Sequence, residues 1–182
     1  MKIIGITGTL GAGKGTVVDY LVKDMGYKHY SVRAFLIEEI KKRGLPVNRD
    51  SMTEVANELR AKYSPAYIIE QLYGIAEKGG VSSIIESIRT PGEIDFLKKQ
   101  GSFILLAVNA DPKLRYDRVV IRGSETDKIS FETFIANEKR EFITSDPNKQ
   151  NLSKCIQLAD YVLHNDGSIS DLVTQVSEVI GD

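Results

Sequence analysis

The stretch GTLGAGKGT, residues 8–16, follows the short apolar segment MKIIGIT. Gly8, Gly13 and Lys14 match the phosphate-binding pattern G-x-x-x-x-G-K-[ST], but the hydroxyl comes one residue late, at Thr16. A glycine-rich loop between a buried strand and a helix turns N–H groups toward phosphate oxygens, and the helix N-terminus adds about half a positive charge. The stretch therefore predicts a nucleotide-phosphate site at the first strand–helix connection. The alternative is a tight turn without a ligand.

The order Gly13-Lys14-Gly15-Thr16 resembles the loop of adenylate kinases and related nucleoside monophosphate kinases, which commonly read G-x-G-K-G-T. GTPases and many motor ATPases place Ser or Thr directly after the lysine. The resemblance implies ATP as the phosphoryl donor. We expect the phosphates to be bound by the loop residues Gly11, Ala12, Gly13, Lys14, Gly15 and Thr16.

The late hydroxyl also bears on the metal. Without Ser or Thr directly after the lysine, Mg²⁺ depends more on phosphates, water and a carboxylate. Thr16 and Glu86 are the predicted magnesium-shell residues, acting through water.

Apolar runs with strand character alternate with amphipathic segments along the chain. Helical spacing extends over residues 14–26, 35–44 and 92–101, and each of these segments stops at glycine. This alternation predicts an α/β fold, a P-loop kinase core with a five-stranded parallel sheet flanked by helices. The predicted strands are residues 2–7, 28–32, 81–87, 102–110 and 160–165.

Composition limits the domain organisation and the class of partner. The chain has 182 residues, 42% of them apolar, enough for one sizeable core, so we expect a single domain over 1–182. An acceptor-binding excursion is expected at about 33–80 and a lid at about 115–145. With 24 basic and 25 acidic residues, no overall field favours nucleic acid or a membrane. A single cysteine and the absence of a long apolar run predict a cytoplasmic protein. The expected partner is a small nucleotide, and the sequence does not define the oligomeric state.

The segment IIESIRTPGE, residues 84–93, ends an apolar strand with Glu86 and then Arg89. Ligands of open α/β sheets gather at the carboxyl ends of strands, so both side chains should face the same crevice as the phosphate loop. Glu86 would then hold a magnesium-bound water or orient the acceptor, and Arg89 would bind an acceptor phosphate. A surface ion pair of Arg89 with Glu86 or Glu93 is the alternative. The segment also resembles the D-x-x-R segment of adenylate-kinase-related proteins and the D-x-R-x-x-x-E segment of phage-type deoxynucleotide kinases, whose acidic position falls at Ser87.

The segment NADPKLRYDRVVIRG, residues 109–123, places Arg115, Arg118 and Arg122 on one helix face. Three like charges on one stripe are explained if the face meets an anion, such as a transferring phosphoryl group. A solvated charged face is the alternative. The polar residues 123–130 that follow have the composition of a mobile lid.

The segment LADYVLHNDGS, residues 158–168, together with this arginine helix resembles dephospho-CoA kinases, which carry an A-D-x-V-I-x-N-x-G-S signature. The resemblance implies that Arg118 and Arg122 are lid arginines and that the turn from Asn165 to Gly167 passes beside the adenine of ATP. Taken alone, an NDG turn after a strand is ordinary turn chemistry.

The acceptor region matches these families less well. Arg33 follows the second predicted strand, and NELRAKYSP, residues 57–65, resembles a helix of archaeal adenylate-kinase-related proteins. This resemblance makes Arg60, with Tyr63, a candidate for the acceptor site. Arg33 and Arg60 are alternatively ordinary surface arginines.

Three functions follow from these residues. The leading hypothesis is an ATP- and Mg²⁺-dependent kinase acting on a nucleotide-like acceptor, a nucleoside or deoxynucleoside monophosphate, with Lys14, Arg89, Arg118 and Arg122 as its catalytic residues. The second is a dephospho-CoA kinase with a divergent acceptor site, and the third is a nucleotide-dependent switch or assembly ATPase.

Overall fold

The fold is centred on one parallel sheet. The computed structural model describes residues 1–124 and 128–181. The sheet has five strands in the order β2-β3-β1-β4-β5, and all its neighbouring pairs are parallel. The α/β class and all five predicted strands are confirmed, with small differences at the ends. The strands are β1 (Ile3–Gly8), β2 (Lys28–Ser31), β3 (Ser83–Glu86), β4 (Phe103–Asn109) and β5 (Tyr161–His164).

Helices connect every pair of consecutive strands, as parallel pairing requires. The region from about residue 33 to 80 contains helices α2, α3 and α4 between β2 and β3, and the region from about 115 to 145 contains most of α6 and all of α7. The helices are α1 (Lys14–Lys23), α2 (Val32–Lys42), α3 (Arg49–Lys62), α4 (Tyr67–Gly79), α5 (Pro91–Lys98), α6 (Pro112–Arg122), α7 (Phe131–Phe142), α8 (Leu152–Gln157) and α9 (Ile169–Ile180).

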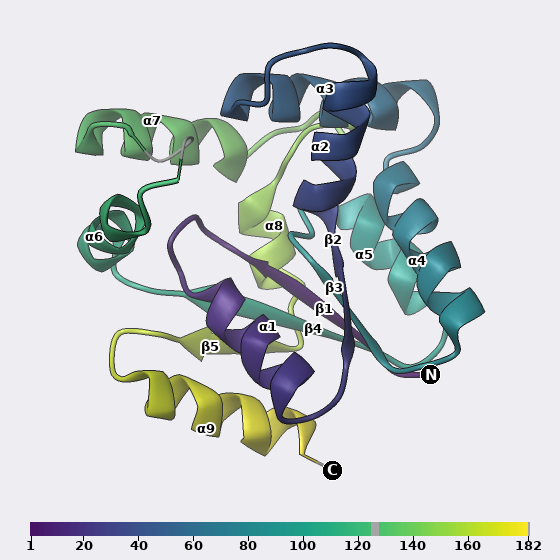
Figure 1. Ribbon diagram of the computed structural model, residues 1–182, viewed down its shortest axis with the longest axis vertical. Helices are drawn as coiled ribbons and strands as arrows, with labels where there is room; N and C mark the ends of the chain where they lie inside the picture. Colours follow the sequence, from purple (N-terminus) through teal and green to yellow (C-terminus); the bar gives the residue numbers. More distant parts are fainter. Residues whose placement is uncertain (125–127, 182) are drawn as a thin grey trace.

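The core lies on both faces of the sheet because strand side chains alternate between them. Ile4 and Ile6 of β1 pack with α1 and α9, and Ile3 packs with the helices of the opposite face, α2 to α5 and α8. Figure 1 shows α1 and α9 together on one side of the sheet. Cys155, the single cysteine, is fully buried in the second of these layers, and burial raises the pKa of its thiol to about 12.

The connection after β3 shows how local sequence fixes a helix start. Thr90 caps α5 by accepting from the N–H of Glu93, and the Glu93 carboxylate accepts from the N–H of Thr90 in return. Pro91 takes the first helical position, where its fixed φ and missing N–H suit the helix start. This capping box also buries Glu93 beside Arg89.

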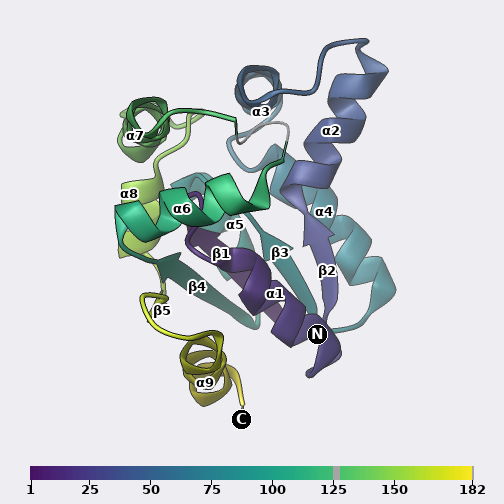
Figure 2. The same cartoon turned by 60° about the vertical axis from the view of Figure 1, so that its left-hand side comes forward.

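The carboxyl ends of the strands carry the segments expected to bind ligands. Beyond the end of β1, where the glycine-rich loop begins, α3, α6 and α7 lie over this edge of the sheet (Figures 1 and 2). Among the described residues, no helix is long and apolar enough to cross a membrane.

Candidate functional site

The glycine-rich loop between β1 and α1 requires glycine at two inner positions. Gly11 has φ +77°, and an added Cβ would lie 2.3 Å from the carbonyl oxygen of Arg115. Gly13, which precedes α1, has φ +104°, and an added Cβ would lie 2.1 Å from Nδ2 of Asn165. The first N–H groups of α1 have no acceptor within the helix, and they start at Lys14 and Gly15. The loop therefore has the backbone of an anion site.

Lys14 is held inside this loop. Its Nζ donates to the carbonyl oxygens of Gly8 at 2.9 Å and Thr9 at 2.8 Å. Burial, together with the nearby Arg89 guanidinium, lowers the pKa of Lys14 to about 7. An anion at this position would relieve both effects, because negative charge favours the protonated amine.

The loop opens into a cavity of about 710 Å³. Within the described part of the chain, its lining has seven lysine or arginine side chains against two glutamates. Such an excess of positive charge suits a ligand with several negative charges. The cavity brings together most of the site residues predicted from the sequence, but not Tyr63, Arg115 or the buried Ala12. Its predicted lining residues are Gly11, Gly13, Lys14, Gly15, Thr16, Arg33, Arg60, Glu86, Arg89, Arg118, Arg122, Asn165 and Gly167.

The turn after β5 is fastened to the glycine-rich loop. Asn165 is buried, and its Nδ2 donates to the carbonyl oxygen of Ala12 at 2.9 Å. Its own carbonyl accepts from Nη2 of Arg118 at 2.8 Å. The side chain of Asn165 thus holds the loop in place, and Gly167 lines the cavity next to it.

Glu86 and Arg89 lie at the carboxyl end of β3, as expected from the strand order. Glu86 is the register partner of Ser31, whose Oγ donates to its Oε1 at 3.2 Å, and Nε2 of His29 lies 3.9 Å from the same oxygen. The alternative pairing of the Arg89 side chain with Glu86 or Glu93 is wrong. The guanidinium instead contacts Glu141, and only the backbone N–H of Arg89 binds Glu93.

The three arginines of α6 do not act as one stripe. Arg115 is buried, pairs with Glu138 of α7, and donates to the carbonyl oxygens of Ala110 and Leu10. Its charge is neutralised within the protein, so the prediction of three arginines meeting an anion is wrong for this residue. Arg118 and Arg122 do line the cavity. The predicted lid stretch, residues 123–130, includes residues 125–127, which lie outside the described residues.

The two arginines predicted for the acceptor region differ. Arg33 is exposed at the cavity rim, with Nη1 3.7 Å from Sδ of Met52. Arg60 is only 2% exposed, so the alternative of a surface arginine is wrong for it. Its Nε and Nη2 donate to Oε1 of Glu93 at 3.0 and 2.8 Å. The exposed Tyr63 stacks on Tyr67.

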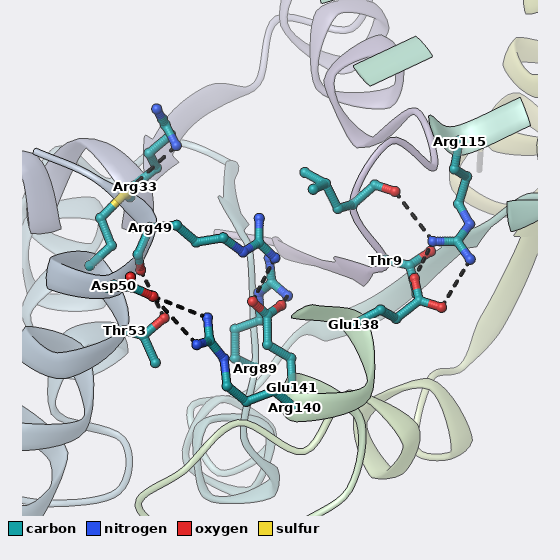
Figure 3. A network of polar contacts seen from close by, with 12 residues as sticks. Thr9, Arg33, Arg49, Asp50, Thr53, Arg89, Arg115, Glu138, Arg140 and Glu141 are labelled. Atoms are coloured by element: carbon teal, nitrogen blue, oxygen red, sulfur yellow. Dashed lines mark hydrogen bonds and ion pairs between the residues drawn. The ribbon is translucent and has the colours of Figure 1, made fainter. Parts of the chain in front are cut away.

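Two charged cavity residues were missed by the sequence reasoning. Arg49 is the first residue of α3 and Glu141 lies in the last turn of α7. Nη2 of Arg49 donates to Oε1 of Glu141 at 2.6 Å, and Nη1 of Arg89 donates to Oε2 at 3.2 Å (Figure 3). Neither residue belongs to a motif, so only the folded arrangement identifies them.

The cavity residues fit a magnesium nucleotide. Mg²⁺ in such sites is bound by one or two carboxylates together with substrate phosphates and water. Among the described residues, three or more acidic, histidine or cysteine side chains do not gather into a metal cluster. Glu86 and Thr16 both line the cavity that contains the phosphate loop and are available to a hydrated ion.

Comparison with known proteins identifies relatives and folds. A family model described as an AAA domain matches residues 4–144. A UPF0200 protein of Methanococcus maripaludis is 32% identical over 181 residues, covering 97% of this chain and 94% of the relative.

Solved structures of kinases share the fold. A gluconokinase from Sinorhizobium meliloti has a TM-score of 0.59 at 13% identity, covering 96% of this chain and 89% of its own. A shikimate kinase from Bacteroides thetaiotaomicron has a TM-score of 0.54 at 13% identity, covering 100% and 99%. These likenesses show a P-loop kinase fold, consistent with the loop and the sheet.

Proposed function

The chain belongs to the UPF0200 family and carries an AAA domain, and from this premise we propose that it is an ATP- and Mg²⁺-dependent kinase that phosphorylates a nucleotide-like acceptor. The acceptor that we favour is a nucleoside or deoxynucleoside monophosphate. The observation that carries the proposal is the continuous cavity from the glycine-rich loop to a second group of arginines. A donor and an acceptor that both carry phosphate need two cationic regions in one space.

The donor half is assigned to the loop and α6. Lys14 and the N–H groups that open α1 would bind the β- and γ-phosphates, and Arg118 and Arg122 would neutralise charge on the transferring group. Glu86 and Thr16 would bind water molecules of the Mg²⁺ shell. Magnesium would supply electrostatic stabilisation of the phosphates.

The acceptor half is assigned to Arg89 together with Arg33 or Arg60. These side chains line the cavity where β3 ends and α2 and α3 border it. An acceptor phosphate oxygen is already anionic at neutral pH, so transfer to it requires no strong general base. A ribose hydroxyl acceptor, as in a dephospho-CoA kinase, would benefit from a base such as Glu86.

The proposal is tested by a coupled assay of ADP release across nucleoside and deoxynucleoside monophosphates and dephospho-CoA. We expect ADP release to depend on one of the monophosphates and to be abolished in Lys14→Ala. Release with dephospho-CoA alone would assign the hydroxyl acceptor. ATP turnover that is independent of every acceptor would contradict the kinase and support the switch ATPase.

A further inference from the structure

A buried carboxylate sits between two cavity arginines that come from different parts of the fold. Glu141 of α7 has a side chain only 7% exposed, and each of its oxygens accepts from a different guanidinium, Oε1 from Arg49 and Oε2 from Arg89. Figure 3 shows both guanidinium groups directed at this carboxylate. Arg49 begins α3, Arg89 follows β3, and all three residues line the cavity.

The same region contains guanidinium nitrogens that Glu141 does not satisfy. Nε of Arg49 and Nη1 of Arg60 are buried without a hydrogen-bond partner among the described residues. Glu93 links Arg60 to Arg89, because its carboxylate accepts hydrogen bonds from the Arg60 side chain and from the backbone N–H of Arg89. An unsatisfied buried donor is costly, and each such group in a native structure calls for an explanation.

The number of oxygens distinguishes the anion that this site is built for. A carboxylate has two oxygens, and both oxygens of Glu141 are engaged by Arg49 and Arg89. A phosphate group offers a third oxygen and a second negative charge, so it satisfies more of the arginine donors than a carboxylate does. Nε of Arg49 and Nη1 of Arg60 are the donors in excess.

Resting on the proposed function, we propose that Arg49 and Arg89, with Arg60 beside them, bind the phosphate group of the acceptor, and that Glu141 occupies this site while the acceptor is absent. The acceptor phosphate then displaces the carboxylate of α7. Binding of the acceptor is therefore coupled to release of the Glu141 contact between α7 and α3. The apparent affinity for the acceptor is reduced by the fraction of molecules in which Glu141 holds the site.

The chain offers a matched control for this exchange. Arg140 of α7 contacts Asp50 of α3 at 3.4 Å, one residue along from Arg49 and Glu141 on each helix. Asp50 has a side chain 76% exposed and does not line the cavity. Asp50→Asn removes an α3–α7 ion pair and leaves the anion site intact, whereas Glu141→Gln removes the charge inside the site.

The experiment follows the side-chain Nε–H signal of Arg49 by NMR in the ¹⁵N-labelled full chain, assigned by its loss in Arg49→Lys. This signal reports the surroundings of Arg49 itself. Inorganic phosphate is the probe, and acetate is the carboxylate comparison. We expect the chemical shift of this signal to move saturably with phosphate and much less with acetate. In Glu141→Gln, half-saturation should occur at about tenfold lower phosphate, which corresponds to Glu141 occupying the site in about nine-tenths of the wild-type molecules. Asp50→Asn should titrate as the wild type does.

Three results would overturn the inference. They are an Arg49 signal indifferent to phosphate, equal responses to phosphate and acetate, and a Glu141→Gln titration that matches Asp50→Asn. If Glu141→Gln does not fold, Glu141→Asp replaces it. Its carboxylate keeps the charge but is one methylene shorter, so its contacts with the two arginines weaken and half-saturation should again move to lower phosphate. The outcome is separable from the kinase assay. If an acceptor is phosphorylated but the Arg49 signal does not respond to phosphate, the proposed function stands and this phosphate site is rejected. If the Arg49 signal responds to phosphate but no acceptor is phosphorylated, the site stands and the proposed function is rejected.

Discussion

Arg60 and Glu93 form a buried ion pair in which neither side chain is more than 1% exposed to solvent. Oε1 of Glu93 accepts from Nε and Nη2 of Arg60, while Oε2 accepts from the backbone N–H groups of Arg89 and Thr90 at 2.7 and 3.0 Å. One carboxylate thus orients a helix start, a cavity arginine and a buried guanidinium. Its contribution is to position the part of the cavity where β3 ends, which we propose binds the acceptor.

Glu93→Gln should lower the free energy of unfolding by about 3–5 kcal/mol, because it leaves the Arg60 guanidinium buried without a counter-charge. Urea unfolding followed by circular dichroism measures the change. The control is Glu58→Gln, whose side chain is 60% exposed and pairs with Arg43 at the surface, where about 0–1 kcal/mol is expected. Equal effects at the two positions would contradict a structural role for the buried pair.

Gly13→Ala and Gly15→Ala should behave differently although they are two residues apart. Gly13 has φ +104° and no room for a Cβ, so roughly 1–3 kcal/mol of stability should be lost to backbone strain alone. Gly15 lies in the first turn of α1 with nothing within 4 Å of an added Cβ, and alanine there should be neutral or stabilising by up to about 1 kcal/mol. Thermal unfolding without nucleotide compares the two. A stable Gly13→Ala variant would disprove this account of the loop.

Lys14 should give the protein a pH-dependent stability. Its pKa falls from 10.5 to about 7 on folding, so between these values the unfolded chain binds a proton that the folded chain has released. The free energy of unfolding then rises with pH over this window, by at most about 1.4 kcal/mol per pH unit. Lys14→Met lacks the contribution, and its stability relative to the wild type should fall from pH 7 to pH 9 in urea titrations. A difference that does not change with pH would show that the amine keeps its proton.

Glu86→Gln should raise the Mg²⁺ concentration needed for half-maximal turnover by about 10–100-fold, as expected when a group that binds metal-held water is lost. Because a phosphate acceptor needs no base, the pH profile of kcat should keep its shape. Glu38→Gln on the exposed side of α2 is the matched control. Loss of the acidic limb of the profile would instead identify Glu86 as a base and favour a hydroxyl acceptor.

The features that could be predicted from the sequence are those that depend on residues close together along the chain. The glycine-rich loop and the five strands depend on spacing within a few positions. The pairings that shape the site do not. Glu141 meets Arg49 across 92 positions in sequence, and Arg115 meets Glu138 across 23. Sequence patterns on α6 therefore placed Arg115 on a ligand-binding face, while its partner on another helix decides what its charge does.

The buried thiol of Cys155 makes the protein convenient to label. A pKa of about 12 and full burial leave almost no thiolate at neutral pH, so the natural cysteine should not compete for maleimide reagents. Exposed positions on the two helices joined by Glu141 and Arg49 then become addressable. A chain carrying Glu54→Cys on α3 and Lys139→Cys on α7 would accept a pair of spin labels without removal of the native cysteine. Their separation, compared with and without a ligand, would report whether the two helices part when the ligand enters.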